Sequence, residues 1–97
     1  MLDLFEHIND RIESAECYAK CAIKHKDSDR ELADVYITIA RTDLDQCARL
    51  RAQASRLANA KVNEIGVTAE LQELCDWYNA KMAQMISKVK LLIESYK

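Results

Sequence analysis

The sequence contains no proline and a single glycine, Gly66, so very little in it interrupts a helix. It has no apolar run near the ~20 residues that a membrane-spanning helix needs. Its first residues, 1–6, lack the basic start and apolar stretch of a secretory signal peptide. One glycine also excludes a glycine-rich phosphate-binding loop. These absences predict a soluble helical protein in a reducing, cytoplasmic setting.

The balance of charged residues bears on the kind of partner that the protein binds. Fourteen Lys and Arg face sixteen Asp and Glu, which gives a formal net charge of −2. A general nucleic-acid binder usually carries a strong positive surplus, so nucleic acid is not an expected partner. A chain of 97 residues suits one domain, residues 1–97. In a reducing compartment its four cysteines are expected to be free thiols; they are Cys17, Cys21, Cys47 and Cys75.

Three segments repeat apolar residues in alternating steps of four and three, which is the spacing of one helix face. The first stripe contains Met1, Phe5, Ile8, Ile12, Ala15, Ala19 and Ala22. The second contains Leu32, Tyr36, Ile39, Asp43, Gln46, Leu50, Gln53 and Leu57. The third contains Leu71, Cys75, Tyr78, Met82, Met85, Val89, Leu92 and Tyr96. The pattern predicts an all-α fold of three long antiparallel helices, over residues 2–25, 28–61 and 68–96.

Two breaks separate the predicted helices. Ser28 and Glu31 have the spacing of a capping box, in which each side chain bonds the other residue's amide. The second break surrounds Gly66, because glycine takes a left-handed turn at little cost. Thr68 is the expected N-cap of the last helix, with Glu70 in its first turn.

Helix length predicts self-association. A helix of 30 residues is ~45 Å long, whereas a compact domain of this size is about 32 Å across. Three such helices form a rod that leaves apolar surface on its sides. A second copy would cover that surface, so we expect a homodimer.

Polar residues interrupt the apolar stripes at a few positions. Asp43, Gln46 and Gln53 fall on the inner stripe of the second helix, and Glu16 is turned inward on the first. A carboxylate inside a bundle is costly unless it is paired, hydrogen-bonded or bound to a metal. Glu16, Asp43 and Gln46 therefore form one candidate cluster. We expect Asp43 to pair with a nearby base such as Arg41 or Lys81.

The same region resembles the first helix pair of ferritin-like and rubrerythrin-like proteins, most of all the short members found in phages and prophages. The resemblance is carried by Ala15-Glu16-Cys17-Tyr18-Ala19, Glu31-Leu32-Ala33-Asp34-Val35-Tyr36, Ala40, Asp43-Leu44-Asp45-Gln46 and Leu50. It implies a ferritin-like helical bundle. It also implies half of a di-metal site, with Glu16 as the inward glutamate and Asp43-x-x-Gln46 in place of Glu-x-x-His.

The chain departs from that family pattern in ways that bear on metal binding. Gln46 stands where an imidazole is expected, and an amide is a poor ligand for iron or manganese. The third helix has no Glu-x-x-His, and a fourth helix is missing. Dimerisation could complete such a bundle. We therefore favour a hydrogen-bonded structural cluster without a cofactor over an iron or manganese site.

Two further features indicate interaction surfaces. Trp77 lies one step off the third stripe, and a half-exposed aromatic residue is favoured at protein interfaces. Arg49, Arg51 and Arg56 give the second helix a local positive surplus that could meet an acidic partner.

The sequence thus predicts a protein that is not an enzyme and that acts through protein–protein contacts, as a structural or interaction protein that could be phage-encoded. One alternative is a ferritin-like metal-binding protein that uses Glu16 and Asp43. Another is a small anti-defence inhibitor of a host protein or nuclease, an idea based on analogy with small helical phage proteins.

Overall fold

The computed structural model describes residues 2–65 and 69–96, and over these residues the chain is helical with no strand. The helices are α1 (Leu2–His25), α2 (Arg30–Ile65) and α3 (Ala69–Ser95). The prediction of three long helices is confirmed. The first helix has the predicted bounds, and the second begins two residues later and ends four residues later than predicted. The third ends one residue earlier than predicted, and its predicted first residue lies outside the described residues.

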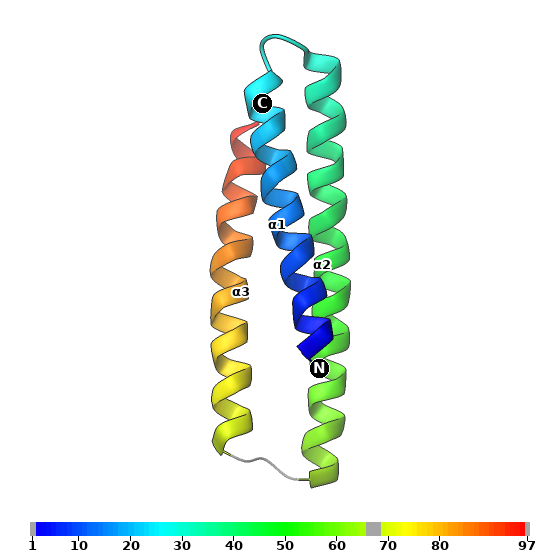
Figure 1. The fold of residues 1–97 in the computed structure, drawn as a ribbon, viewed down its shortest axis with the longest axis vertical. Coiled ribbons are helices and arrows are strands. Elements are labelled where there is room, and N and C mark those ends of the chain that lie inside the picture. The colour runs from blue at the N-terminus through cyan, green and yellow to red at the C-terminus, as the bar shows by residue number, and fades with distance from the viewer. Residues whose placement is uncertain (1, 66–68, 97) are drawn as a thin grey trace.

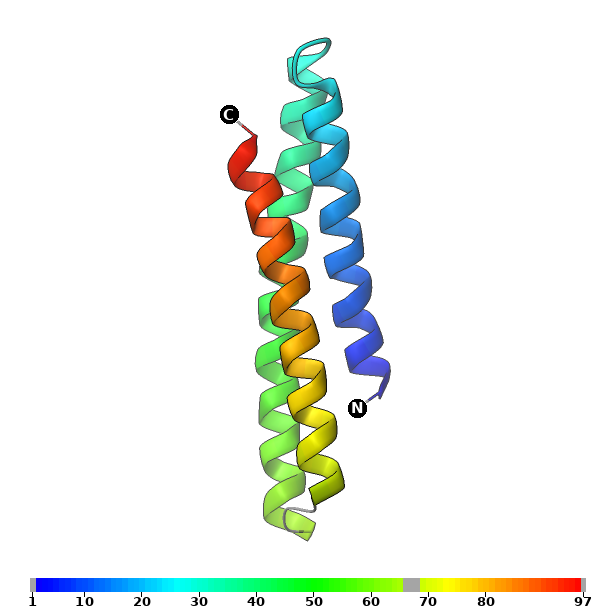
Figure 2. The same ribbon diagram turned by 90° about the vertical axis from the view of Figure 1, so that its left-hand side faces the viewer.

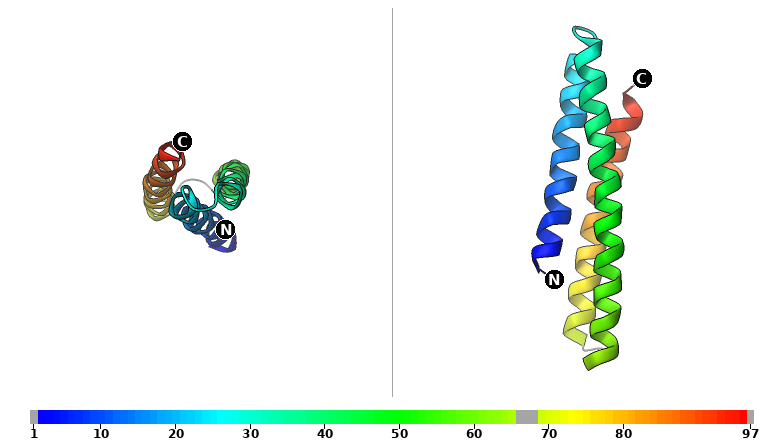
Figure 3. Two further views of the ribbon diagram at one scale, coloured as in Figure 1. Left: turned by 90° about the horizontal axis from the view of Figure 1, so that it is seen from above. Right: turned by 90° about the vertical axis from the view of Figure 1, so that its right-hand side faces the viewer.

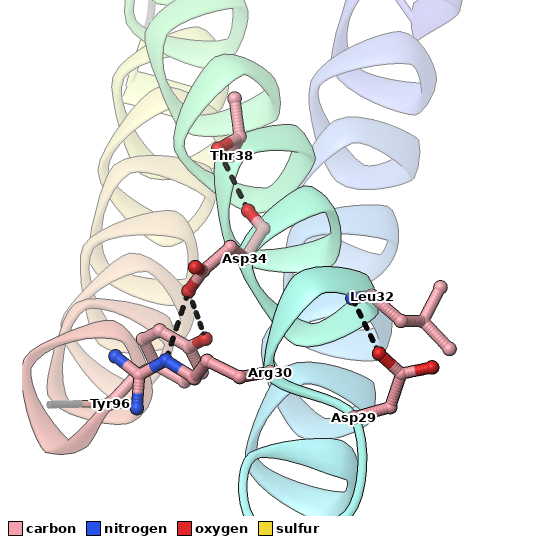
Figure 4. Close-up of polar contacts among 6 residues, drawn as sticks. All are labelled: Asp29, Arg30, Leu32, Asp34, Thr38 and Tyr96. Carbon is pink, nitrogen blue, oxygen red and sulfur yellow. Dashed lines mark hydrogen bonds and ion pairs between the residues drawn. The ribbon is translucent and has the colours of Figure 1, made fainter.

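The predicted cap of α2 was one residue out of place. The backbone amide of Leu32 donates to Oδ1 of Asp29 at 3.2 Å, so Asp29 is the N-cap and Arg30 the first helical residue (Figure 4). The capping box expected from Ser28 and Glu31 is therefore wrong. An aspartate at this position also places a negative charge at the positive end of the helix dipole. The predicted break at Gly66 and cap at Thr68 lie outside the described residues.

The molecule is a rod, as helix length predicted. Its principal extents are 55 × 17 × 17 Å and its radius of gyration is 16.1 Å, whereas a compact domain of this length has a radius of about 12–13 Å. Consecutive helices run in opposite directions (Figures 1 and 2). Viewed along the rod, α1 lies between α2 and α3 (Figure 3). It packs extensively against α2 and less against α3, whereas α2 and α3 have little direct contact.

The central position of α1 explains why its apolar stripe is buried. Five of its apolar residues, Ile8, Ile12, Ala15, Ala19 and Ala22, are fully buried, as the first stripe predicted. They divide between two core clusters. One contains Ile8 and Ile12 with Cys47 of α2 and Met82, Ile86 and Val89 of α3. The other contains Ala19 and Ala22 with Ala33, Ile37 and Ala40 of α2 and Tyr96 at the end of α3.

The buried face of α2 is not the predicted one. Its buried apolar residues are Ala33, Ile37, Ala40, Cys47 and Ala54. Of the predicted stripe, only Asp43 is buried, while Leu32, Gln46, Gln53 and Leu57 are exposed. Small side chains allow α1 and α2 to approach closely, so the alanine face turns inward and larger residues remain outside.

No helix among the described residues combines the length and apolar character that crossing a membrane requires.

Candidate interaction site and buried polar residues

Asp43 is the one buried charged residue among those described, with 5% of its surface exposed. Its carboxylate accepts a 2.6 Å hydrogen bond from the Ser14 hydroxyl and lies 3.3 Å from the Arg11 guanidinium. Both partners are on α1, whereas the predicted partners Arg41 and Lys81 are not involved. Asp43 therefore fixes α2 against α1 by a charge-assisted bond.

Glu16 belongs to a separate network on the other side of α1. Its carboxylate lies 2.9 Å from Lys20 Nζ, one turn along α1, and 3.0 Å from Lys88 Nζ of α3. The hydrogen bond from Lys20, followed by that from Lys88, holds the pKa of Glu16 below its ordinary value of 4.5. Glu16 is thus a polar link between α1 and α3.

The Glu16 pairs give the stability of the protein an acid dependence. In the unfolded chain the lysine bonds are absent, so the pKa returns to about 4.5. Their contribution is therefore complete above that pH and is lost as the pH falls through the lower folded pKa. We expect Glu16→Gln to lower the free energy of unfolding near neutral pH by about 0.5–1 kcal/mol, because both lysines are largely exposed. Urea unfolding across the acid range measures the difference.

The exposed Glu13→Gln provides the matched control for that series, since Glu13 accepts only from Asn9 on the same helix. The difference in the free energy of unfolding between wild type and the Glu16 variant should disappear as the pH falls. The Glu13 variant should have the same free energy of unfolding as wild type at every pH. A difference in the free energy of unfolding that increases as the pH falls would contradict a lowered pKa for Glu16.

The predicted cluster of Glu16, Asp43 and Gln46 is not assembled. Gln46 is exposed rather than inward, so its predicted orientation is wrong. The two carboxylates are occupied by different partners, Glu16 by lysines and Asp43 by Arg11 and Ser14. In the part of the chain that the structure describes, no three His, Cys, Asp or Glu side chains gather as metal ligands would. Neither carboxylate therefore provides an observation that favours metal binding.

The four cysteines are free thiols in distinct environments. Cys47 is buried, and burial raises the pKa of its thiol. Cys21 is half-buried, and its pKa is raised by burial and then by the adjacent Cys17. Cys17 is exposed. The raised pKa values of Cys21 and Cys47 favour the unreactive thiol form.

The end of α3 is fastened to the start of α2 by Tyr96 (Figure 4). Its ring is buried and its hydroxyl donates to Asp34 Oδ1 at 2.5 Å. The same oxygen lies 3.2 Å from Nε of Arg30, whose guanidinium covers the Tyr96 ring. The bond from Tyr96 lowers the pKa of Asp34, whereas burial and then Asp34 raise the pKa of Tyr96. Asp34 is therefore ionised and Tyr96 neutral near neutral pH.

A hollow between α1 and α3, which we name the aromatic groove, lies beside Trp77. It has a volume of about 310 Å³ and is lined by Phe5, Glu6, Asn9, Asp10, Trp77, Tyr78, Lys81, Met82 and Met85. Phe5 stacks on Tyr78 with centroids 4.2 Å apart, and Trp77 meets the Tyr78 ring edge-on at 4.9 Å. Three aromatic rings from two helices thus form one wall.

Trp77 remains accessible in this groove, with 55% of its surface exposed. Lys81 Nζ lies 5.0 Å from the centre of the indole and steadies its orientation. One turn before it, Leu74 is also exposed. Glu6 and Asp10 supply acidic groups on the α1 side of the groove. The predicted partial exposure of Trp77 is confirmed, and the contribution of Phe5 to the same surface was not anticipated.

The three arginines predicted to form an interaction surface, Arg49, Arg51 and Arg56, do not form one patch. Arg51 is half-buried and lines a groove between α2 and α3, which Arg49 and Arg56 do not reach. Arg49 lies 3.4 Å from Asp45, and Arg56 donates to Gln53 at 2.9 Å. The expected single basic surface is therefore divided between two sides of the helix.

No protein-family model, curated protein or solved structure matches this chain. None of the comparisons identifies a ferritin-like or phage family, so that resemblance stays a prediction. The aromatic groove and the exposed faces of the helices are the features of the molecule that bear on function.

Proposed function

We propose that this chain is a non-enzymatic interaction protein that binds another protein in the aromatic groove. The observation that carries the proposal is the exposure of Trp77 beside Tyr78 and Phe5 in a hollow of about 310 Å³. Tryptophan and tyrosine dominate the energetics of protein interfaces, because they bury a large rigid surface. An indole that the fold itself leaves half uncovered gains most from a partner.

The chemistry of the groove suits binding rather than catalysis. Its lining residues include two acids, one lysine and one amide, but no serine, cysteine or histidine to serve as a nucleophile with its base. Its wall is aromatic, and Met82 and Met85 add adaptable apolar surface. Such a lining accepts an apolar side chain and tolerates variation in its shape.

The acidic residues of α1 indicate the charge of the partner. Glu6 and Asp10 line the α1 side of the groove, and Asp3 and Glu13 are exposed on the same helix. A partner segment with a large apolar residue flanked by lysine or arginine would place its apolar group against Trp77 and its charge near Glu6 and Asp10. Complementary charge of this kind accelerates association and selects among partners.

The test compares capture of proteins from a cell extract by wild type and two variants. Trp77→Ala removes the indole, and Leu91→Ala removes a more exposed apolar side chain that lies outside the groove. We expect the first variant to lose the captured protein and the second to retain it. With the purified partner, Trp77→Ala should raise the dissociation constant by about 30-fold or more, as interface hot spots do.

Fluorescence supplies an independent measurement, because Trp77 is the single tryptophan in the sequence. Its emission should shift to shorter wavelength when a partner covers the indole. Capture that survives Trp77→Ala, or binding without any change in that emission, would contradict a role for the groove.

A second copy of the chain is the other partner that we propose. Apolar residues that the fold leaves uncovered include Leu32, Val35, Leu57, Leu74, Trp77 and Leu91. A rod only 17 Å wide buries less apolar surface than a compact domain does, which favours association side by side.

A further inference from the structure

One face of α2, which we name the outer face, is left largely uncovered by α1 and α3, and Leu50 is the one of its residues that also packs against the first core cluster. Its residues repeat at three- and four-residue spacing, and they are Leu32, Val35, Ile39, Gln46, Leu50, Gln53 and Leu57. Val35 is 53% exposed, and Leu32 and Leu57 are each more than a third exposed. Ile39 and Leu50 are half-buried. This is the spacing of a helix-pairing seam, with polar residues near its middle.

A shallow hollow lies near the start of this face. It has a volume of about 400 Å³ and is lined by Glu31, Asp34, Val35, Thr38 and Ile39. Val35 and Ile39 provide apolar surface, and Glu31 and Asp34 provide carboxylates. Arg49 and Arg56 are exposed on the second half of the same helix. The helix therefore has acid beside the hollow at one end and base at the other.

We infer that a second copy of this chain pairs along the outer face of α2 in antiparallel orientation. The intervals match, since Leu32 and Ile39 are seven residues apart and so are Leu50 and Leu57. Reversing one helix therefore places Leu32 opposite Leu57 of the second copy and Ile39 opposite Leu50 of the second copy. In that register Arg56 of the second copy reaches the hollow beside Glu31 and Asp34.

Charge selects this orientation over the parallel one. Parallel pairing would place both Glu31 side chains at one end of the dimer and both Arg56 side chains at the other, so the unlike charges would not meet. Antiparallel pairing brings unlike charges together at both ends and opposes the two helix dipoles. Near the centre, the Gln46 residues of the two copies lie within one helical turn of each other, and a polar contact in an otherwise apolar seam fixes the register.

The surface area that the seam buries determines how tightly the two copies are expected to bind. From Leu32 to Leu57 the helix rises ~38 Å, and with a helix about 11 Å wide two such strips bury roughly 850 Å² in total. Stable interfaces usually bury about 1,200 Å² or more, so the dimer should dissociate in the micromolar range or above. Its mass should therefore depend on concentration.

Charge reversal tests the register. Sedimentation equilibrium of wild type should show a shift from the chain mass of 11.1 kDa toward twice that mass as the concentration rises from about 1 to 300 μM. Glu31→Arg alone and Arg56→Glu alone should each raise the dimer dissociation constant about tenfold or more, because each creates two like-charge contacts in a symmetric dimer. The double variant Glu31→Arg/Arg56→Glu should return to within about threefold of wild type.

This inference rests on the proposed association of two copies, but it can fail independently of the aromatic groove. Trp77→Ala serves as the control, and it should dimerise as wild type does while losing the separate partner. Circular dichroism confirms that each variant remains helical. A wild type that stays monomeric over the whole range, reversals that leave the dissociation constant unchanged, or a double variant no stronger than the single ones would overturn the antiparallel seam.

Discussion

Shortening Ile12 to alanine is expected to lower the free energy of unfolding by about 3 kcal/mol. Ile12 is fully buried in the first core cluster, at the level where α1 is enclosed by Cys47 of α2 and by Met82 and Val89 of α3. The substitution removes three carbon atoms and leaves a void that rigid neighbouring helices cannot close. Since small domains are stable by only about 5–15 kcal/mol, the loss is a large fraction of the total.

Urea unfolding followed by circular dichroism measures this effect. Leu91→Ala is the matched control, because Leu91 is 67% exposed and its truncation should change stability by less than about 0.5 kcal/mol. Equal losses from the two variants would show that α1 does not occupy the centre of the bundle.

Replacing Asp43 with alanine is expected to lower the free energy of unfolding by about 2–3 kcal/mol. The change removes the acceptor for the Ser14 hydroxyl at 2.6 Å and the partner of Arg11 at 3.3 Å. The serine is left without its acceptor inside the α1–α2 interface. Arg11 is 40% exposed and can turn toward water, which keeps the loss below that of a wholly buried pair.

A combined variant distinguishes a buried polar network from a simple loss of volume. Ser14→Ala/Asp43→Leu removes the donor and the acceptor together and fills the space with an apolar side chain. It should be more stable than Asp43→Ala, because no buried polar group is left unpaired. Thermal and urea unfolding of both variants measure the difference. A combined variant less stable than Asp43→Ala would indicate that the carboxylate itself organises this interface.

The number and approximate bounds of the helices could be predicted because they depend on local information. The absence of proline and the three- and four-residue spacing of apolar residues operate within one turn of helix. The start of α2 shows the limit of such reasoning. Both Ser28 and Asp29 are good caps, and the choice of Asp29 depends on where the chain leaves α1.

The orientation of α2 could not be predicted by weighting large apolar residues. Leu32, Leu50 and Leu57 form a regular stripe, yet the buried face is made mostly of alanines with Ile37 and Cys47. Alanine contributes little apolar area by itself, but it lets two backbones approach closely and gain contacts along their whole length. That gain exists only when the partner helix is present, so it leaves a weak signal in a single sequence.

The candidate site was predictable only in part for a similar reason. Trp77 was expected to be exposed from its place beside the third stripe. The groove also needs Phe5 from the other end of the chain, and its stacking on Tyr78 depends on α3 lying along α1. The contacts of Ser14 with Asp43 and of Lys88 with Glu16 likewise come from helix pairings that residue spacing does not specify.

The unequal lengths of the helices make one end of the rod easier to unfold than the rest. α2 and α3 continue beyond the first residues of α1, so one end of the rod is a two-helix section without the central helix (Figures 1 and 2). The direct contact between α2 and α3 is slight, so separating them at that end requires less free energy than unfolding the whole chain. Local unfolding of this two-helix section can therefore precede the opening of the three-helix section.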